Sequence, residues 1–77
     1  MTVDELRAID LHGDALGQYL YERARDLLQG GIPRDDLQTV LTSFYVWLGE
    51  QDRDEDQDAV ADVLDSLVGF CSPSARL

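Results

Sequence analysis

The sequence contains no lysine and no asparagine, and it has one cysteine, one histidine and two prolines in 77 residues. One cysteine cannot form a disulfide within the chain, and a lone thiol is more typical of a reducing compartment than of secretion. No apolar run approaches the ~18 residues of a membrane-spanning helix, and the first residues, MTVDEL, lack the basic and apolar regions of a signal peptide. We therefore expect a cytoplasmic protein that does not associate with membranes.

Basic charge is scarce as well. The chain has six arginines and sixteen acidic residues, which gives a formal net charge of −10. A GC-rich or salt-adapted genome would produce a similar balance, but it would not explain why half of the acids fall within residues 50–65, where only Arg53 opposes them. This charge disfavours direct binding to DNA or RNA, which depends on Lys and Arg at the phosphates. It favours a protein partner with a basic surface, approached by electrostatic steering.

The charge-free stretch at residues 37–49 is the expected centre of the fold. Leu37, Leu41, Phe44 and Leu48 recur at helical spacing, with Val40 beside them, so we expect the core to form around Phe44 and Leu48. Gly49 is expected to end this helix. The far side of the helix is uncharged too, where a surface helix usually carries Lys or Glu. That side is either covered by the N-terminal helix or left open for a partner.

The N-terminal third predicts a short helix followed by a break. Thr2 and Glu5 form the capping-box pattern T-x-x-E ahead of a helix at residues 3–11. In His12-Gly13-Asp14, the glycine is expected to stop that helix, and Asp14 to cap the next one. One apolar stripe continues through the break, so a single helix over residues 3–29 is the alternative. We favour the break, because one helix of about 40 Å would overhang the others.

Three longer helices are expected from the remaining sequence. They cover residues 14–29, the stretch from Pro33 to Gly49, and residues 55–70. Gly30-Gly31 is expected to end the first of these helices. Short connections place successive helices antiparallel. The predicted fold is all-α: a small antiparallel bundle of three main helices plus a short N-terminal helix, four helices in all. Residues 1–71 form this single domain, and residues 72–77 form a flexible C-terminal tail.

Three short motifs invite a chemical interpretation. The alternating acids from Asp52 to Asp58 resemble a calcium loop, but the glycine that an EF-hand needs at its sixth position is missing. Trp47-Leu48-Gly49 resembles the turn of small secreted WXG-type hairpins, but Gly30-Gly31 adds a second break and the tail has no tyrosine. Asp65-Ser66-Leu67 resembles the phosphopantetheine site of acyl carrier proteins, but here the serine lies late in a helix. A solvated connector, an interfacial Trp and an ordinary helical serine explain these motifs better.

The sequence shows no catalytic set. His12 is expected to interact with a helix end as a cap, and Cys71 to be a small buried hydrophobe of the last helix. One His and one Cys do not make a tetrahedral metal site, and no glycine-rich phosphate loop occurs. We therefore predict no enzymatic activity, no catalytic residues, no cofactor and no metal.

The strongest candidate for a binding surface is acidic. Glu55, Asp58, Asp62 and Asp65 share one helix face. The predicted partner-binding residues are these four and three acids before or among them, Asp52, Asp54 and Asp56. A row of carboxylates resembles phosphates in charge, so such a surface could act as a nucleic-acid mimic. Bacterial immunity proteins, antitoxins and phage inhibitors, anti-CRISPR proteins included, are often similarly small and acidic. The expected function is an inhibitor of this type that binds a basic, nucleic-acid-handling protein.

The alternative is a structural or adaptor subunit that associates with itself as a homodimer. It would use the uncharged side of the 37–49 helix together with nearby aromatic residues, since aromatic, charge-poor patches are typical of interface cores. The candidate residues are Tyr19, Tyr21, Thr39, Thr42, Ser43, Val46 and Trp47. The two hypotheses differ in their observables: salt-sensitive binding by a monomer, or a dimer in sedimentation.

Overall fold

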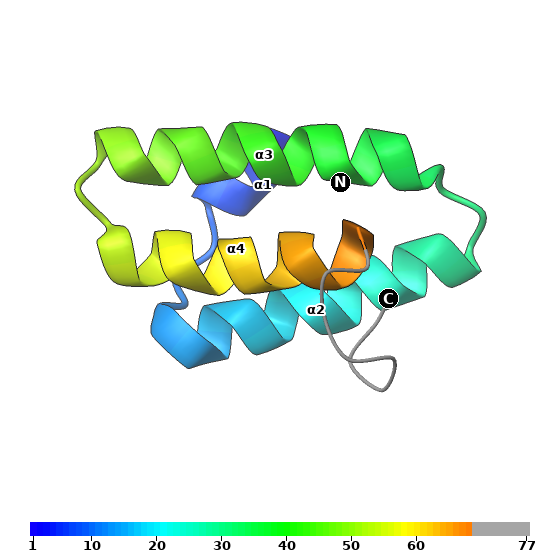
Figure 1. The fold of residues 1–77 in the computed structure, drawn as a ribbon, viewed down its shortest axis with the longest axis horizontal. Helices are drawn as coiled ribbons and strands as arrows, with labels where there is room; N and C mark the ends of the chain where they lie inside the picture. The colour runs from blue at the N-terminus through cyan, green and yellow to red at the C-terminus, as the bar shows by residue number, and fades with distance from the viewer. Residues whose placement is uncertain (69–77) are drawn as a thin grey trace.

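The computed structural model describes residues 1–68, which form four α-helices and no strand. The helices are α1 (Val3–Arg7), α2 (Gly13–Gln29), α3 (Arg34–Glu50) and α4 (Asp54–Val68). Successive long helices run in opposite directions, so α2 and α4 run the same way (Figure 1). The predicted all-α bundle of three main helices and a short N-terminal helix is confirmed. The predictions for Cys71 and for the tail at residues 72–77 lie outside the described residues.

The break between the first two helices is confirmed. The Thr2 hydroxyl accepts a hydrogen bond from the Glu5 amide at 3.3 Å, and the Thr2 amide donates one to the Glu5 carboxylate at 3.4 Å, which completes the capping box. The helix ends at Arg7 rather than at residue 11, and residues 8–12 lead to the start of α2. The alternative of one helix over residues 3–29 is therefore wrong. As a separate element, α1 can turn and pack against α3.

The two turns between the long helices use the same backbone arrangement, a Schellman motif. After α2, the amides of Gly31 and Ile32 donate to carbonyls of the last helical turn, both at 3.1 Å. After α3, the Arg53 amide donates to the Leu48 carbonyl at 3.0 Å, and Asp52 takes the left-handed conformation with φ of 56°. The prediction that Gly49 ends this helix is wrong, because α3 continues through Glu50 and Asp52 makes the turn.

The core lies where α4 meets the other helices. The helix α4 packs against both α2 and α3, and Figure 1 shows it between them. Phe44 and Leu48 are fully buried, as the sequence predicts. The buried cluster draws on every helix: Leu6, Leu16, Leu20, Ala24, Leu37, Leu41, Phe44, Leu48, Val60, Val63 and Leu67. Burying one such leucine or phenylalanine stabilises the fold by about 1.5–3 kcal/mol.

The parallel helices α2 and α4 approach closely at two small residues. A Cβ atom placed on Gly17 would lie 3.3 Å from the Cβ of Ala59, which is tighter than ordinary van der Waals contact. Only a glycine on α2 therefore permits this separation without a shift of α4. The close contact fixes the distance between the two helices and leaves a shallow groove along one side of it.

None of the helices described in residues 1–68 combines the length and the apolar character that crossing a membrane requires.

Candidate functional site

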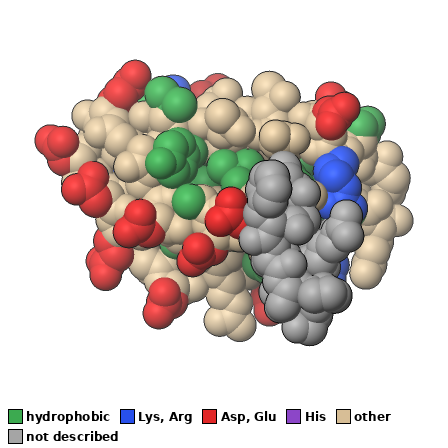
Figure 2. All heavy atoms as spheres, in the orientation of Figure 1, with side chains coloured by type: hydrophobic (Ala, Val, Ile, Leu, Met, Phe, Trp, Pro, Cys, Tyr) green, Lys and Arg blue, Asp and Glu red, His purple; other side chains and the backbone are tan. Residues whose placement is uncertain are grey.

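Six of the seven predicted partner-binding acids lie on the surface. We call this set the acidic face: Asp52, Asp54, Glu55, Asp58, Asp62 and Asp65. All six are exposed, and within residues 1–68 none of them forms an ion pair with an arginine or with His12. Asp52 belongs to the turn and the other five to the outer side of α4. Figure 2 shows acidic side chains spread over one end of the molecule and along α4.

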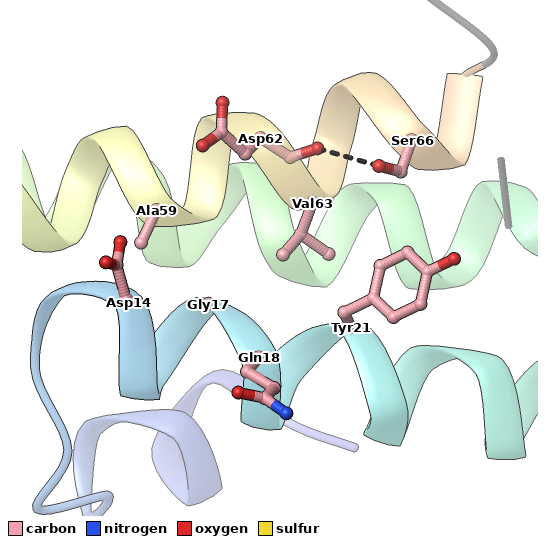
Figure 3. Close-up of a pocket in the computed structure, with 8 residues that line it drawn as sticks. All are labelled: Asp14, Gly17, Gln18, Tyr21, Ala59, Asp62, Val63 and Ser66. Atoms are coloured by element: carbon pink, nitrogen blue, oxygen red, sulfur yellow. Dashed lines mark hydrogen bonds between the residues drawn. The ribbon is translucent and has the colours of Figure 1, made fainter. Parts of the chain in front are cut away.

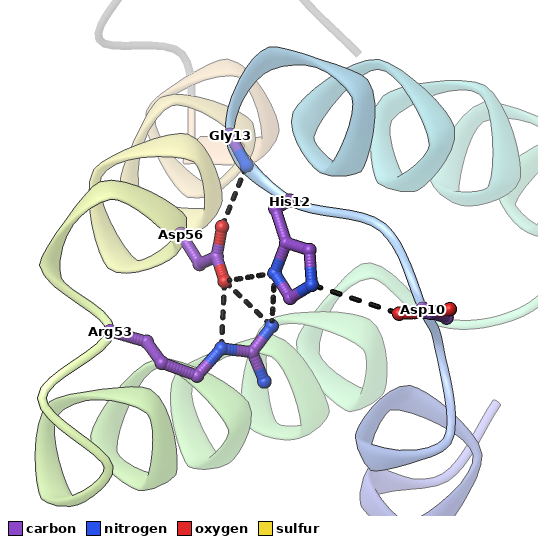
Figure 4. Close-up of polar contacts among 5 residues, drawn as sticks. All are labelled: Asp10, His12, Gly13, Arg53 and Asp56. Atoms are coloured by element: carbon purple, nitrogen blue, oxygen red, sulfur yellow. Dashed lines mark hydrogen bonds and ion pairs between the residues drawn. The ribbon is translucent and has the colours of Figure 1, made fainter.

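Asp56 is the exception. It is only 4% exposed, and both oxygens of its carboxylate are occupied (Figure 4). Oδ1 accepts a hydrogen bond from the Gly13 amide at 2.6 Å. Oδ2 accepts one from Arg53 Nε at 2.7 Å and lies 2.6 Å from Arg53 Nη2 and 3.0 Å from His12 Nδ1. The expectation that Asp56 faces a partner with the other acids is wrong, since its carboxylate is turned into the fold.

This buried carboxylate caps the N-terminus of α2 from another helix. His12 occupies the N-cap position but makes no side-chain cap hydrogen bond, and Asp14, the predicted cap, lies in the first turn. Gly13 has φ of 56°, a conformation that favours glycine, and its amide is the donor to Asp56. The negative charge of Asp56 also interacts favourably with the partial positive charge at a helix N-terminus. Asp56, 43 residues from Gly13 in the sequence, thus caps α2 in place of Asp14.

The histidine has a different role from the one expected. Helix α1 ends five positions before His12, so the ring does not cap it. Instead Nδ1 lies 3.0 Å from Asp56 Oδ2, and Nε2 lies 3.7 Å from Asp10 Oδ1. Because a carboxylate only accepts, the contact with Asp56 is a hydrogen bond when Nδ1 carries a proton. His12 therefore helps to hold the Asp56 carboxylate in place.

The environment of Asp56 shifts its pKa in two opposing directions. Burial disfavours the charged form and raises the pKa. Hydrogen bonds from His12, Gly13 and Arg53, together with the charge of Arg53, outweigh burial, so the pKa of Asp56 falls below its ordinary value of 3.8. The carboxylate is therefore ionised near neutral pH, and its contacts stabilise the folded chain there.

Trp47 belongs to the same end of the bundle. Its ring stacks on Phe44 with centroids 5.9 Å apart. The guanidinium groups of Arg7 and Arg53 lie 5.3 and 5.7 Å from its centre, within the range of cation–π attraction. The half-buried Trp47 thus joins α1, α3 and the start of α4. These internal contacts occupy much of the ring that we expected to be available to a partner.

The remaining residues of the alternative interface do not form one surface. Four of them share the outer side of α3, which α1 leaves uncovered: Thr39, Thr42, Ser43 and Val46, all exposed. Val46 is 53% exposed. Tyr19 and Tyr21 belong to α2, where Tyr19 is exposed and Tyr21 faces α4 across the groove. Only the α3 residues therefore remain as a continuous uncharged patch.

The groove between α2 and α4 contains residues that the sequence did not bring together. It has a volume of about 250 Å³ and is lined by Asp14, Gly17, Gln18, Tyr21, Ala59, Asp62, Val63 and Ser66. Figure 3 shows the carboxylate of Asp14 at one end and the ring of Tyr21 at the other. Gly17 in α2 was the available signal, because a helical glycine often marks a close approach, but the sequence does not say to which helix.

Within residues 1–68, no group of three side chains from His, Cys, Asp and Glu is arranged so that it could hold a metal ion. The absence of enzymatic activity and of a cofactor stays a prediction. No protein family model, no curated protein and no solved structure matches the chain.

Proposed function

We propose that the protein is a small, non-enzymatic binding module of the inhibitor, immunity or antitoxin type, anti-CRISPR proteins included, whose acidic face engages a basic protein that handles nucleic acid. The observation that carries this proposal is the exposure of six carboxylates that no described arginine or histidine neutralises. Along α4, Asp54, Asp58, Asp62 and Asp65 follow at steps of three or four residues, which places neighbours about 5–6 Å apart. A row of this spacing presents charge as a nucleic-acid strand does.

The buried Asp56 supports this function indirectly. Its hydrogen bonds tie the first turn of α4 to the start of α2, and Arg53 holds the same carboxylate beside the turn. The acids on either side of it are therefore carried by an ordered segment. Charges fixed before binding lose less conformational entropy on association than charges on a loose tail. The net charge of −10 would also accelerate the encounter with a basic partner.

Charge reversal tests this proposal. We expect the variant with Asp58→Lys, Asp62→Lys and Asp65→Lys to bind the basic partner about tenfold more weakly, because three exposed pairs are lost and each contributes up to ~1 kcal/mol. The measurement is a pull-down from the native host, followed by the affinity for the retained protein at several salt concentrations. We expect the wild-type affinity to fall steeply with salt.

The matched control reverses three exposed acids elsewhere: Glu22→Lys, Asp26→Lys and Asp36→Lys. This control has the same net charge as the first variant, so it measures the effect of total charge while the acidic face is left unchanged. We expect it to retain the partner. Equal retention by both variants would show that the acidic face is not the binding surface.

A second candidate function is self-association through the outer side of α3. The observation in its favour is the uncovered, uncharged patch of Thr39, Thr42, Ser43 and Val46. Under this alternative the protein sediments as a dimer, and Val46→Glu converts it to a monomer, because two buried carboxylates would face each other across a symmetric interface. Ala15→Glu, at an exposed position of α2, is the control and should leave the dimer intact. A monomeric wild-type protein at high concentration would eliminate this candidate.

A further inference from the structure

We propose that the groove between α2 and α4 receives an arginine side chain of the basic partner. This inference rests on the proposed function and adds the place where one partner residue binds. At about 250 Å³, the groove is smaller than the ~300–1,000 Å³ of a typical ligand pocket, so it suits one side chain better than a cofactor.

The charge of the groove selects a cation. Asp14 from α2 and Asp62 from α4 are both exposed, and neither forms an ion pair with a basic residue in residues 1–68. No arginine or histidine lines the groove. The Ser66 hydroxyl donates to the backbone carbonyl of Asp62 at 3.0 Å, which leaves the Asp62 carboxylate available (Figure 3). A guanidinium has five N–H donors, so it can bind one of these carboxylates and still donate to a second acceptor.

The apolar part of the groove suits the rest of an arginine. Gly17, Ala59 and Val63 provide a surface without charge, against which the methylene stem can pack. The Tyr21 ring closes the end of the groove opposite Asp14 and extends this surface. Lysine has a compact ammonium that is more strongly hydrated than a guanidinium, so it loses more on leaving water for the groove. The combination of carboxylates without a basic partner and an apolar floor therefore points to arginine.

The groove is continuous with the acidic face, since Asp62 belongs to both. A partner that covers the acidic face would place its neighbouring side chains over α2. Asp14, in contrast, belongs to the groove alone. Substitution of Asp14 therefore tests the groove separately from the acidic face.

The experiment is a titration of the isotope-labelled full chain with hexa-arginine, followed by the amide resonances in NMR spectra at low salt. We expect saturable shifts at the amides of Gly17, Asp62 and Val63. Asp14→Asn should weaken binding about threefold, and Gln18→Arg about tenfold, because the new guanidinium occupies the groove in place of the peptide. Gln38→Arg, an exposed site on α3, is the control with the same charge and should weaken binding less than twofold.

The outcomes separate this inference from the proposed function. If hexa-arginine shifts only residues 52–58, if Asp14→Asn binds like the wild type, and if Gln18→Arg binds like Gln38→Arg, the groove inference is overturned while the acidic face remains in use. Equal groove shifts with hexa-lysine would overturn the assignment to arginine. An absence of saturable binding would overturn the groove inference as well, whereas the pull-down with charge-reversed variants decides the proposed function independently. Unchanged circular dichroism and melting temperature show that each variant is folded.

Discussion

Asp56→Asn is expected to lower the free energy of unfolding by about 2–4 kcal/mol at neutral pH, because it removes a buried charge that three neighbouring groups stabilise. Arg53 would lose its carboxylate partner, and the Gly13 amide would keep at best a neutral acceptor. A bundle of this size has a total stability of only a few kcal/mol. The melting temperature should therefore fall by roughly 10–20 °C, measured by circular dichroism.

The pH dependence of this effect has a defined sign. The pKa of Asp56 is lower in the folded chain than its ordinary value of 3.8, so the folded state favours the ionised form. The stabilisation is complete above the unfolded-state pKa and disappears as the pH falls through the folded-state pKa. The stability difference between wild type and Asp56→Asn should therefore be constant near neutral pH and shrink below about pH 4.

Asp58→Asn is the matched control, because it makes the same chemical change two residues away on the exposed side of α4. We expect it to change the stability by less than ~0.5 kcal/mol. Similar melting temperatures for Asp56→Asn and Asp58→Asn would show that the buried network does not stabilise the fold. A difference that grew on acidification would contradict the pKa argument.

Gly17→Val should destabilise the protein by about 2 kcal/mol, because it inserts a branched side chain where α2 and α4 are already in contact. The Cβ alone would lie 3.3 Å from Ala59 Cβ and 3.6 Å from the Ala59 carbonyl oxygen. One of the two methyl groups of valine must then push α4 away or occupy the groove. Chemical denaturation measures the loss of stability, and the same variant should bind hexa-arginine more weakly.

Two further variants separate packing from helix propensity. Ala15→Val changes an exposed position of the same helix and should cost only about 0.5 kcal/mol, the propensity penalty of a β-branched residue. Gly17→Ala should be nearly neutral, since a gain of about 1 kcal/mol in propensity opposes the tight contact with Ala59. A Gly17→Val protein as stable as wild type would show that the two helices can separate without cost.

The acids around Asp56 illustrate how far the sequence predicts the candidate site. Their helical spacing placed Glu55, Asp58, Asp62 and Asp65 on one side of a helix, and all four are exposed. The same spacing puts Asp56 on the buried side, four and seven residues before Val60 and Val63, but it could not show that the carboxylate joins a cluster with His12 and Gly13. Those partners are 44 and 43 residues distant, and no local pattern reports such a contact.

Local chemistry was sufficient for the helices themselves. The Thr2–Glu5 capping box, the Gly30-Gly31 stop and the apolar stripe around Phe44 act within one or two turns, so the sequence by itself determined four helices and the sides that they bury. It misplaced the end of α3, because Gly49 was taken as a stop. In the bundle, Gly49 has another role. Because it has no side chain, it leaves room for Gln57, whose side-chain amide donates to the Tyr45 carbonyl at 3.1 Å.

Only the tertiary structure decided which side chains meet. It buried Asp56, brought two arginines to the Trp47 ring, placed Tyr21 beside α4, and formed the groove beside Gly17. The physical reason is the difference in range. Capping and periodicity depend on neighbours a few positions apart, whereas the position of α4 between α2 and α3 depends on how all the buried side chains fill one core.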